Sequence, residues 1–244
     1  MSNLRFYSPE NLSVGATVKL SDNAATHATR VMRLNAGDAL TLFCGDSFDY
    51  ACELISIKKS EALVKIKSSV KLENESNLII TLLQGISAGD RMDIALQKAA
   101  ELGVNCIIPL KTERSMVKLD EEKTKKRVEH WQNVVIAACE QCGRAVIPKV
   151  ASPVTLAMWL ASNPANKNTR ITLNPLASRK LKDLPKPQDK IELLVGAEGG
   201  LSANEIALAG QHGFLGVQMG KRILRTETAP LASIAAMQTL WGDF

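Results

Sequence analysis

Two strand–glycine–helix junctions in the last third of the chain constrain its fold more than any other feature. The apolar run Ile191–Val195 leads directly into residues 196–202 (GAEGGLS), and a second junction follows at residues 219–230 (MGKRILRTETAP). An apolar run that breaks at glycine and opens into a helical pattern is typical of a buried strand in an α/β protein. Such junctions expose main-chain groups at one end of a sheet, where α/β proteins bind small ligands. The sequence therefore predicts a ligand site built largely from main chain.

The bulk composition limits the class of protein. At 244 residues, with 45% apolar but only 4% aromatic residues, the chain can form one large domain or two modest domains with an aliphatic core. A net charge of +5 permits an RNA partner without requiring one. No apolar run approaches the ~20 residues that cross a bilayer, there is no signal-peptide core, and five cysteines fit a reducing compartment. We expect a cytoplasmic protein with no membrane partner.

The first seventy residues are predicted to be rich in β-structure. Strands are expected at residues 39–44, 48–57 and 62–67, with a short helix near residues 22–31. Closely spaced strands with little helix favour a small barrel. The polar residues 71–77 (KLENESN) are the best linker candidate.

Beyond this linker, strands and helices alternate, which predicts a mostly parallel sheet covered on both faces. Strands are expected at residues 78–83, 104–110, 170–173, 191–195 and 215–219.

Helices are predicted between these strands. They are expected at residues 91–102 and at Glu121–Cys142, and another starts at Ser152-Pro153 with proline in its first turn. Residues 202–205 form a capping box that opens a further helix. The last helix, residues 231–241, is predicted to be capped by Thr228.

The two glycine-containing loops carry the candidate chemistry. Residues 196–200 match neither a P-loop nor a dinucleotide fingerprint, so they form either a plain strand-to-helix turn or a cradle for a bulky ligand. The second loop mixes cations, hydroxyls and a carboxylate with Ile223 and Leu224, which can form an apolar wall for an aromatic base. Arg225 and Glu227 remain available to a substrate.

Taken together, these motifs closely resemble those of the 16S ribosomal RNA uridine-N3 methyltransferase family within the SPOUT superfamily. The resemblance covers essentially the whole chain, and RILRTETA is its most specific part. The loop at residues 196–200 departs from the usual family pattern by having Ala197 in place of proline. Other matching segments are residues 5–6 (RF), His27, residues 31–33 (VMR), residues 89–104 (GDRMDIALQKAAELGV), residues 113–115 (ERS) and residues 138–144 (ACEQCGR).

The resemblance implies a two-domain α/β protein. Residues 1–72 would form a PUA-like β-barrel that binds RNA, and residues 73–244 a SPOUT methyltransferase domain with a C-terminal trefoil knot. It also implies S-adenosylmethionine as methyl donor, 16S ribosomal RNA or the small ribosomal subunit as partner, and a homodimer packed through the knotted region.

The resemblance further assigns residues to these roles. The donor site would comprise Leu173, Asn174, Gly196, Glu198, Gly199, Met219, Gly220, Ile223 and Leu224. RNA would be bound by Arg5, His27, Arg30, Arg33, Arg91, Arg114 and Arg144.

Methylation at uridine N3 requires loss of a proton flanked by two carbonyls and stabilisation of the resulting anion. Arg225 is the first candidate to stabilise that anion, aided by Arg91. The base is either Glu227 or solvent, because a carboxylate of ordinary pKa is weak for this proton. Alternatively, Glu227 forms an ion pair with Arg225 or Arg222.

Other functional readings remain open. The first alternative to uridine-N3 methylation is another SPOUT activity, such as ribose 2′-O methylation. The second is a non-catalytic RNA-binding or ribosome-assembly factor. The CxxC at residues 139–142 lacks a second cysteine pair, and His27, His130 and His212 have no zinc-site spacing. We therefore expect no metal site.

Overall fold

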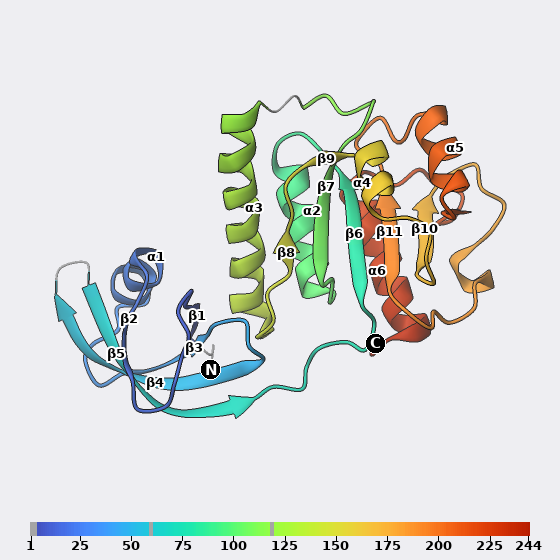
Figure 1. The fold of residues 1–244 in the computed structure, drawn as a ribbon. Helices are drawn as coiled ribbons and strands as arrows, with labels where there is room; N and C mark the ends of the chain where they lie inside the picture. The colour runs from blue at the N-terminus through green and yellow to red at the C-terminus, as the bar shows by residue number, and fades with distance from the viewer. Residues whose placement is uncertain (1–3, 59–60, 118–119) are drawn as a thin grey trace. The chain divides into compact units, whose positions relative to one another are not determined.

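The computed structural model describes residues 4–58, 61–117 and 120–244 and forms two compact units (Figure 1). The smaller unit comprises Met1–Glu75 together with Cys139–Ile147, and the larger unit comprises Ser76–Ala138 and Pro148–Phe244. The smaller unit therefore includes a segment from the middle of the chain, which the expected division at residues 72 and 73 does not contain.

The smaller unit is built on a five-stranded sheet with the order β1-β3-β4-β5-β2. β1 pairs parallel to β3 and the other pairs are antiparallel. All three predicted strands are present, and β5 continues beyond its predicted end. Among the described residues no ladder joins β1 to β2, so the pairing path is open. The strands are β1 (Arg5–Tyr7), β2 (Thr17–Lys19), β3 (Ala39–Phe43), β4 (Phe48–Lys58) and β5 (Glu61–Lys71).

A helix covers the core of this sheet. The predicted helix near residues 22–31 consists of α1 (Asp22–Thr26) followed by one wider π-helical stretch, η1 (His27–Val31). Ser21 caps α1, because its side chain accepts a hydrogen bond from the Ala24 N–H. The alternating residues of the strands supply the rest of the core, including Phe6, Leu40, Leu42, Leu54, Val64 and Ile66.

The larger unit is built on a seven-stranded sheet in which every pair is parallel. Its order is β12-β10-β11-β6-β7-β8, and β9 also pairs with β7. Each predicted strand of this sheet is present, with ends shifted by at most two residues. The strands are β6 (Ile80–Gly85), β7 (Cys106–Lys111), β8 (Lys149–Val150), β9 (Val154–Thr155), β10 (Thr169–Leu173), β11 (Ile191–Val195) and β12 (Leu215–Val217).

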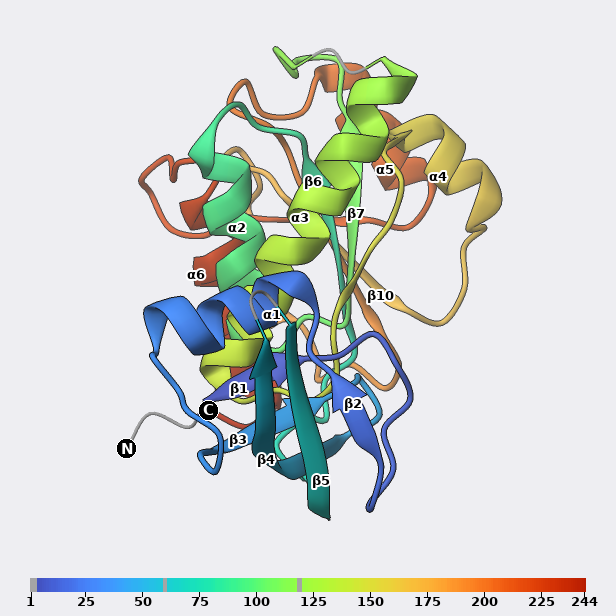
Figure 2. The same ribbon diagram turned by 90° about the vertical axis from the view of Figure 1, so that its left-hand side faces the viewer.

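Helices cover both faces of this sheet, as predicted. α4 and α5 pack on one face around Leu83, Leu110 and Leu194 of the strands. α2 and α6, which contact each other, lie on the other face (Figures 1 and 2). The helices are α2 (Asp90–Glu101), α3 (Glu121–Cys142), α4 (Leu156–Ser162), α5 (Ala203–Gln211) and α6 (Thr228–Trp241), with a short 3₁₀ helix, η2 (Leu181–Asp183).

None of the helices in the described part of the chain is long and apolar enough to cross a membrane.

Two predicted helix starts are wrong. The helix expected at Ser152-Pro153 begins at Leu156, because Val154 and Thr155 pair with β7 and Thr155 then caps α4 through the Met158 N–H. Pairing with the sheet outweighs the local preference of proline for a first helical turn.

The last helix also differs from its prediction. α6 starts at Thr228 instead of residue 231, so Thr228 is its first helical residue and does not cap it. The backbone carbonyl of Arg225 accepts hydrogen bonds from the Thr228 and Ala229 N–H groups, and thus supplies the expected cap. By contrast, the predicted capping box of α5 is confirmed, because Ser202 and Glu205 exchange their side-chain and backbone bonds.

A buried ion pair fixes the amino ends of β10 and β11. Arg170 and Glu192 lie opposite each other in the ladder, with the Arg170 Nε 2.6 Å from the Glu192 Oε2. The guanidinium also donates to the carbonyls of His212 and Asn163. Both side chains are almost fully buried. The pair is thus completely partnered, which is the condition under which a buried charge is tolerated.

We predict that Arg170→Leu lowers the free energy of unfolding by about 3 kcal/mol or more, because Glu192 is left buried and unpaired. Urea denaturation of the two proteins measures this difference. As a control, Glu122→Gln breaks the exposed Lys126–Glu122 pair and leaves stability unchanged. Equal losses in the free energy of unfolding for the two substitutions would contradict the stabilising role of the Arg170–Glu192 pair.

Candidate ligand-binding site

A cavity of about 960 Å³ lies at the carboxyl ends of β10, β11 and β12 in the larger unit. It is lined by residues 173–176 after β10, residues 195–201 after β11 and residues 219–220 and 222–227 after β12. Its volume is typical of pockets for small organic ligands, and its position is the usual ligand site of a parallel sheet. The two glycine loops therefore meet at one site, as the sequence predicted.

The structure brings most of the predicted site residues together. All nine residues assigned to the donor site line this cavity, and so do Arg225, Glu227, Arg91 and Arg114. The roles of these residues remain predictions. The other candidates for RNA binding, which are Arg5, His27, Arg30, Arg33 and Arg144, belong to the smaller unit.

Backbone contacts explain the glycines of the first loop. A Cβ on Gly196 would lie 2.6 Å from the Gly200 carbonyl carbon, and a Cβ on Gly85 would lie 2.3 Å from the Ala197 nitrogen. The Gly200 N–H donates to the Ala197 carbonyl, with Gly200 at φ +68°, so the loop closes on itself as a tight turn. The loop is therefore both a structural turn and a wall of the cavity.

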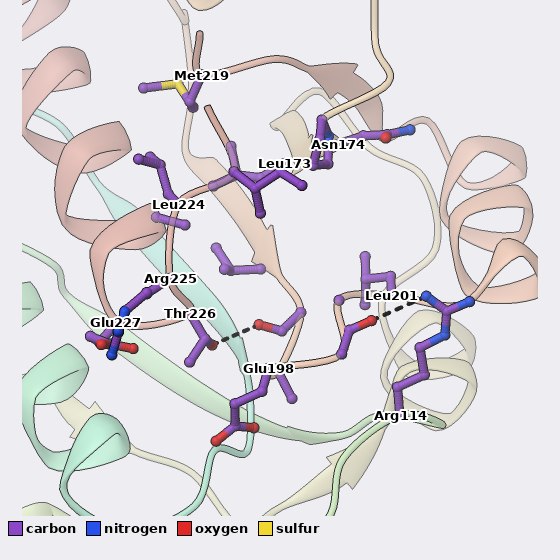
Figure 3. Close-up of a pocket in the computed structure, with 18 of the residues that line it drawn as sticks. Arg114, Leu173, Asn174, Glu198, Leu201, Met219, Leu224, Arg225, Thr226 and Glu227 are labelled. Atoms are coloured by element: carbon purple, nitrogen blue, oxygen red, sulfur yellow. Dashed lines mark hydrogen bonds between the residues drawn. The ribbon is translucent and has the colours of Figure 1, made fainter. Parts of the chain in front are cut away.

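The carboxylate of Glu198 braces this loop. Its Oε1 accepts hydrogen bonds from the Ala88 N–H at 2.8 Å and from Arg91 at 3.2 Å. Burial opposes ionisation of the carboxyl, but these bonds outweigh it and hold the pKa of Glu198 below its ordinary value. Figure 3 shows the side chain turned away from Leu173 and Leu224. The side chain thus holds the loop in place while its main chain lines the cavity.

Two further bonds hold the same loop from the segment after β7. Arg114 donates to the Gly199 carbonyl at 3.1 Å (Figure 3). The buried Glu205, which belongs to the α5 capping box, accepts from the Glu113 N–H at 3.0 Å. Arg91 and Arg114 thus have protein partners in addition to any contact with RNA.

Thr226 is a residue of this site that the sequence analysis missed. Its buried hydroxyl donates to the Gly196 carbonyl at 3.0 Å and lies 3.0 Å from the Ser87 hydroxyl. It therefore connects the second loop to the first. The only sequence signal was its position between the candidate residues Arg225 and Glu227.

Arg225 and Glu227 differ in their surroundings. Arg225 is exposed, whereas the Oε2 of Glu227 is buried and has no hydrogen-bond partner. Within the described residues no ion pair joins Glu227 to Arg225 or Arg222, which contradicts the alternative ion-pair reading. Because an unpartnered buried acceptor is costly, this oxygen is suited to receive a hydrogen bond from a ligand.

Two candidates for RNA binding in the smaller unit are buried and bonded to protein groups. Arg5 is 6% exposed and binds Asp49 at 2.6 Å and the Cys139 carbonyl at 2.8 Å. Arg144 is 5% exposed and binds Glu75 at 2.6 Å. Both guanidinium groups are buried inside the unit and bonded to protein groups, and their contact with RNA stays a prediction.

The other candidates in the smaller unit are exposed. His27 and Arg30 lie on η1, and Arg33 follows it in the left-handed region with φ +56°. The His27 ring also packs edge-on against Phe6, at 5.6 Å between centroids. These side chains are free to meet a polyanion.

The CxxC segment behaves as a packed helix end. Cys139 is buried, and desolvation raises the pKa of its thiol to about 12. Cys142 is half-buried, and both are free thiols. No group of three or more metal-ligating side chains occurs among the described residues.

The fold and this site define an α/β protein that holds a small organic ligand between main-chain loops at the carboxyl edge of a parallel sheet. The chain belongs to the family of proteins with an RNA methyltransferase domain, whose model matches residues 74–238. A second model, described as an RNA methyltransferase PUA domain, matches residues 20–67 of the smaller unit. The expected PUA-like and SPOUT-type parts are thereby confirmed.

Individual relatives agree with this family. The ribosomal RNA small subunit methyltransferase E of Buchnera aphidicola subsp. Acyrthosiphon pisum is 34% identical over 98% of this chain and 94% of its own length. Among solved structures, the protein of the same name from Neisseria gonorrhoeae, bound to S-adenosyl methionine, is 46% identical with a TM-score of 0.92 over 99% of both chains. A methyltransferase from Legionella pneumophila in complex with the same cofactor is 40% identical with a TM-score of 0.95 over 100% of both chains.

We predict that Glu198→Gln destabilises the protein by on the order of 1 kcal/mol at neutral pH, because a charge-assisted brace is lost. A carboxyl with a lowered pKa stabilises the fold above its ordinary value of 4.5 and loses this effect as pH falls through the lowered pKa. The difference between the two proteins should therefore be flat near neutrality and shrink below about pH 4.5.

Urea denaturation between about pH 7 and pH 3 measures this profile. Glu129→Gln, which removes an exposed carboxylate of α3, is the matched control and should show no such dependence. If the stability difference between wild type and Glu198→Gln grew as the pH fell, the predicted direction of the pH dependence would be wrong.

Proposed function

We propose that this protein transfers a methyl group from S-adenosylmethionine to N3 of a uridine in 16S ribosomal RNA. One observation carries the proposal: all nine residues assigned to the donor line a single cavity together with Arg225 and Glu227. The relative from Neisseria gonorrhoeae, 46% identical over 99% of both chains, was solved with S-adenosyl methionine bound.

The cavity fits this donor. Its volume of about 960 Å³ is sufficient for a bent nucleoside with an amino-acid tail. A Cβ on Gly196 or Gly199 would meet protein atoms within 3 Å, so glycine at both positions lets the loop take the shape in which its main chain lines the cavity. Leu173, Leu224 and Met219 supply apolar surface for the adenine (Figure 3). When bound, S-adenosylmethionine supplies an electrophilic methyl group on a positively charged sulfur.

The residues around the cavity account for the remaining chemistry. Arg225 binds the uracil carbonyl oxygens, on which negative charge develops as N3 loses its proton. The unpartnered Oε2 of Glu227 accepts that proton, or orients the water that does. A donor held by the residues of the two loops would supply its methyl carbon to the N3 lone pair and would keep the electron pair of the broken carbon–sulfur bond on sulfur. No metal is needed for this charge balance.

RNA contacts are assigned to exposed basic side chains. His27, Arg30 and Arg33 lie on the PUA-like unit, and the half-exposed Arg91 lies at the cavity. Phosphate contacts from such side chains give affinity, whereas the target base is recognised in the cavity. A ribosomal RNA substrate places the protein in the cytoplasm.

We predict that Arg225→Ala reduces methyl transfer at least about 100-fold, because the developing anion loses its positive partner. Affinity for S-adenosylmethionine should change less than about twofold, since the donor is held by other groups. Radiolabel transfer to small-subunit RNA and calorimetry with the donor measure the two effects. Arg179→Ala, which removes an exposed arginine that does not line the cavity, should leave both unchanged.

The competing functions give distinct results in the same experiments. Mass spectrometry of nucleosides from the modified RNA distinguishes N3-methyluridine from a 2′-O-methylated ribose. Absence of donor binding by the wild-type protein would instead favour a non-catalytic RNA-binding factor.

A homodimer is favoured by the surface of α6. This helix (TAPLASIAAMQTLW) carries no charged residue, yet Leu240 is 46% exposed and Leu231 is only partly buried. A helix that is apolar on all sides is usually buried. We assign its uncovered side to a second copy of this chain, packed next to the loop from which the helix starts.

We predict that the wild-type protein has the mass of two 26.4 kDa chains in solution and that Leu240→Asp shifts it toward the monomer. Light scattering after size-exclusion chromatography measures the mass. Met158→Asp, a matched change at an exposed apolar residue of α4, should not alter it. A monomeric wild-type protein would reject this assembly.

A further inference from the structure

We infer that Thr226 is a positioning residue for methyl transfer, and that its buried hydroxyl holds the segment carrying Arg225 and Glu227 against the ends of β6 and β11. The inference rests on the proposed function for its kinetic part. Its structural part stands independently, because it concerns hydrogen bonds that exist without any ligand.

The hydroxyl lies at the centre of a small polar network. Thr226 Oγ1 donates to the Gly196 carbonyl at 3.0 Å (Figure 3). It lies 3.4 Å from the Gln84 Nε2 and 3.0 Å from the Ser87 hydroxyl. A hydroxyl has one proton, so while Thr226 donates to Gly196 it can only accept from Gln84 and Ser87. The Ser87 hydroxyl also has the Gly85 carbonyl at 3.3 Å as a second acceptor.

These partners come from three separate parts of the larger unit. Gln84 is at the end of β6, Ser87 is in the loop that follows it, and Gly196 follows β11. β6 and β11 are neighbours in the sheet, with Val195 opposite Gln84. One hydroxyl therefore connects the second loop to the ends of both strands.

Burial makes this connection strong. Thr226 is 8% exposed, Ser87 6% and Gln84 0%. Hydrogen bonds are electrostatically stronger in such surroundings than in water. Removing the shared hydroxyl takes one bond each from the Gly196 carbonyl, Gln84 and Ser87, and the last two keep only their bonds to the Gly85 carbonyl. The valine isostere would keep the packing and lose only these bonds.

The position of Thr226 in the chain links the network to the reacting groups. Arg225 precedes it and Glu227 follows it, and the Arg225 carbonyl accepts the first N–H groups of α6. Both proposed reacting side chains therefore start from a backbone that is fixed between this hydroxyl and the helix start. A displacement of about 1 Å in such a segment can cost on the order of 100-fold in rate.

The test compares Thr226→Val, Thr226→Ser and Thr172→Val. Thr172 is the matched control, since it is a buried threonine of the same unit, its hydroxyl bonds to a strand carbonyl, and it does not line the cavity. We expect Thr226→Val to lower kcat about 10- to 100-fold with less than about a threefold change in donor Kd. Thr226→Ser should restore kcat to within about threefold of wild type, and Thr172→Val should keep it.

Hydrogen–deuterium exchange gives a readout that does not depend on activity. Amides of residues 222–229 should exchange faster in Thr226→Val than in wild type, Thr226→Ser or Thr172→Val. A wild-type protein that transfers no methyl group would defeat the proposed function and leave this prediction standing. Wild-type kcat in Thr226→Val, unchanged exchange there, equal losses in the serine and valine variants, or an equal loss in Thr172→Val would each overturn the inference.

Discussion

The parallel pairing of β11 with β6 is the constraint on which the site depends. The register places Val195 opposite Gln84, so the chain leaves both strands at the same edge and the following loops start side by side. They can touch only because Gly85 lacks a Cβ, which would lie 2.3 Å from the Ala197 nitrogen of the neighbouring loop. Gly196 lets that loop fold tightly on itself, since its Cβ would lie 2.6 Å from the Gly200 carbonyl carbon. Close contact of the backbones creates a cavity walled by main chain, and such a wall admits a flat ligand at short distance.

Three of the six charged residues that line this cavity, Arg91, Arg114 and Glu198, support the loops, so Arg222, Arg225 and Glu227 are left for chemistry. Glu198 holds the first loop to the start of α2, while Arg114 and Glu205 hold it to the segment after β7. The carboxylate oxygen of Glu227 stands apart, because it is buried without a partner. A rigid frame around a few unsatisfied groups is the arrangement expected where electrostatic preorganisation contributes to catalysis.

Whether a sequence-based prediction succeeded depended on how far apart in the chain the interacting residues lie. The eight predicted strands and the α5 capping box are confirmed, since apolar runs and a Ser–Glu pair three residues apart are local signals. The short strands β1, β2, β8 and β9 were not predicted. The start at Ser152-Pro153 failed because pairing with β7, a distant segment, overrode it. The Thr228 cap failed because a backbone carbonyl took its place. The expected trefoil knot stays a prediction.

By itself, the sequence determined the order of strands and helices, the two glycine loops and the set of polar residues in them, because these depend on neighbours within a few positions. Only the tertiary structure decided which polar groups are available. It buried Arg5 against a carbonyl 134 residues away and joined Thr226 to Ser87 across 139 residues. Hydrogen bonds between such distant residues form only after the chain has folded, so no local pattern distinguishes an arginine that meets RNA from one that holds the protein together.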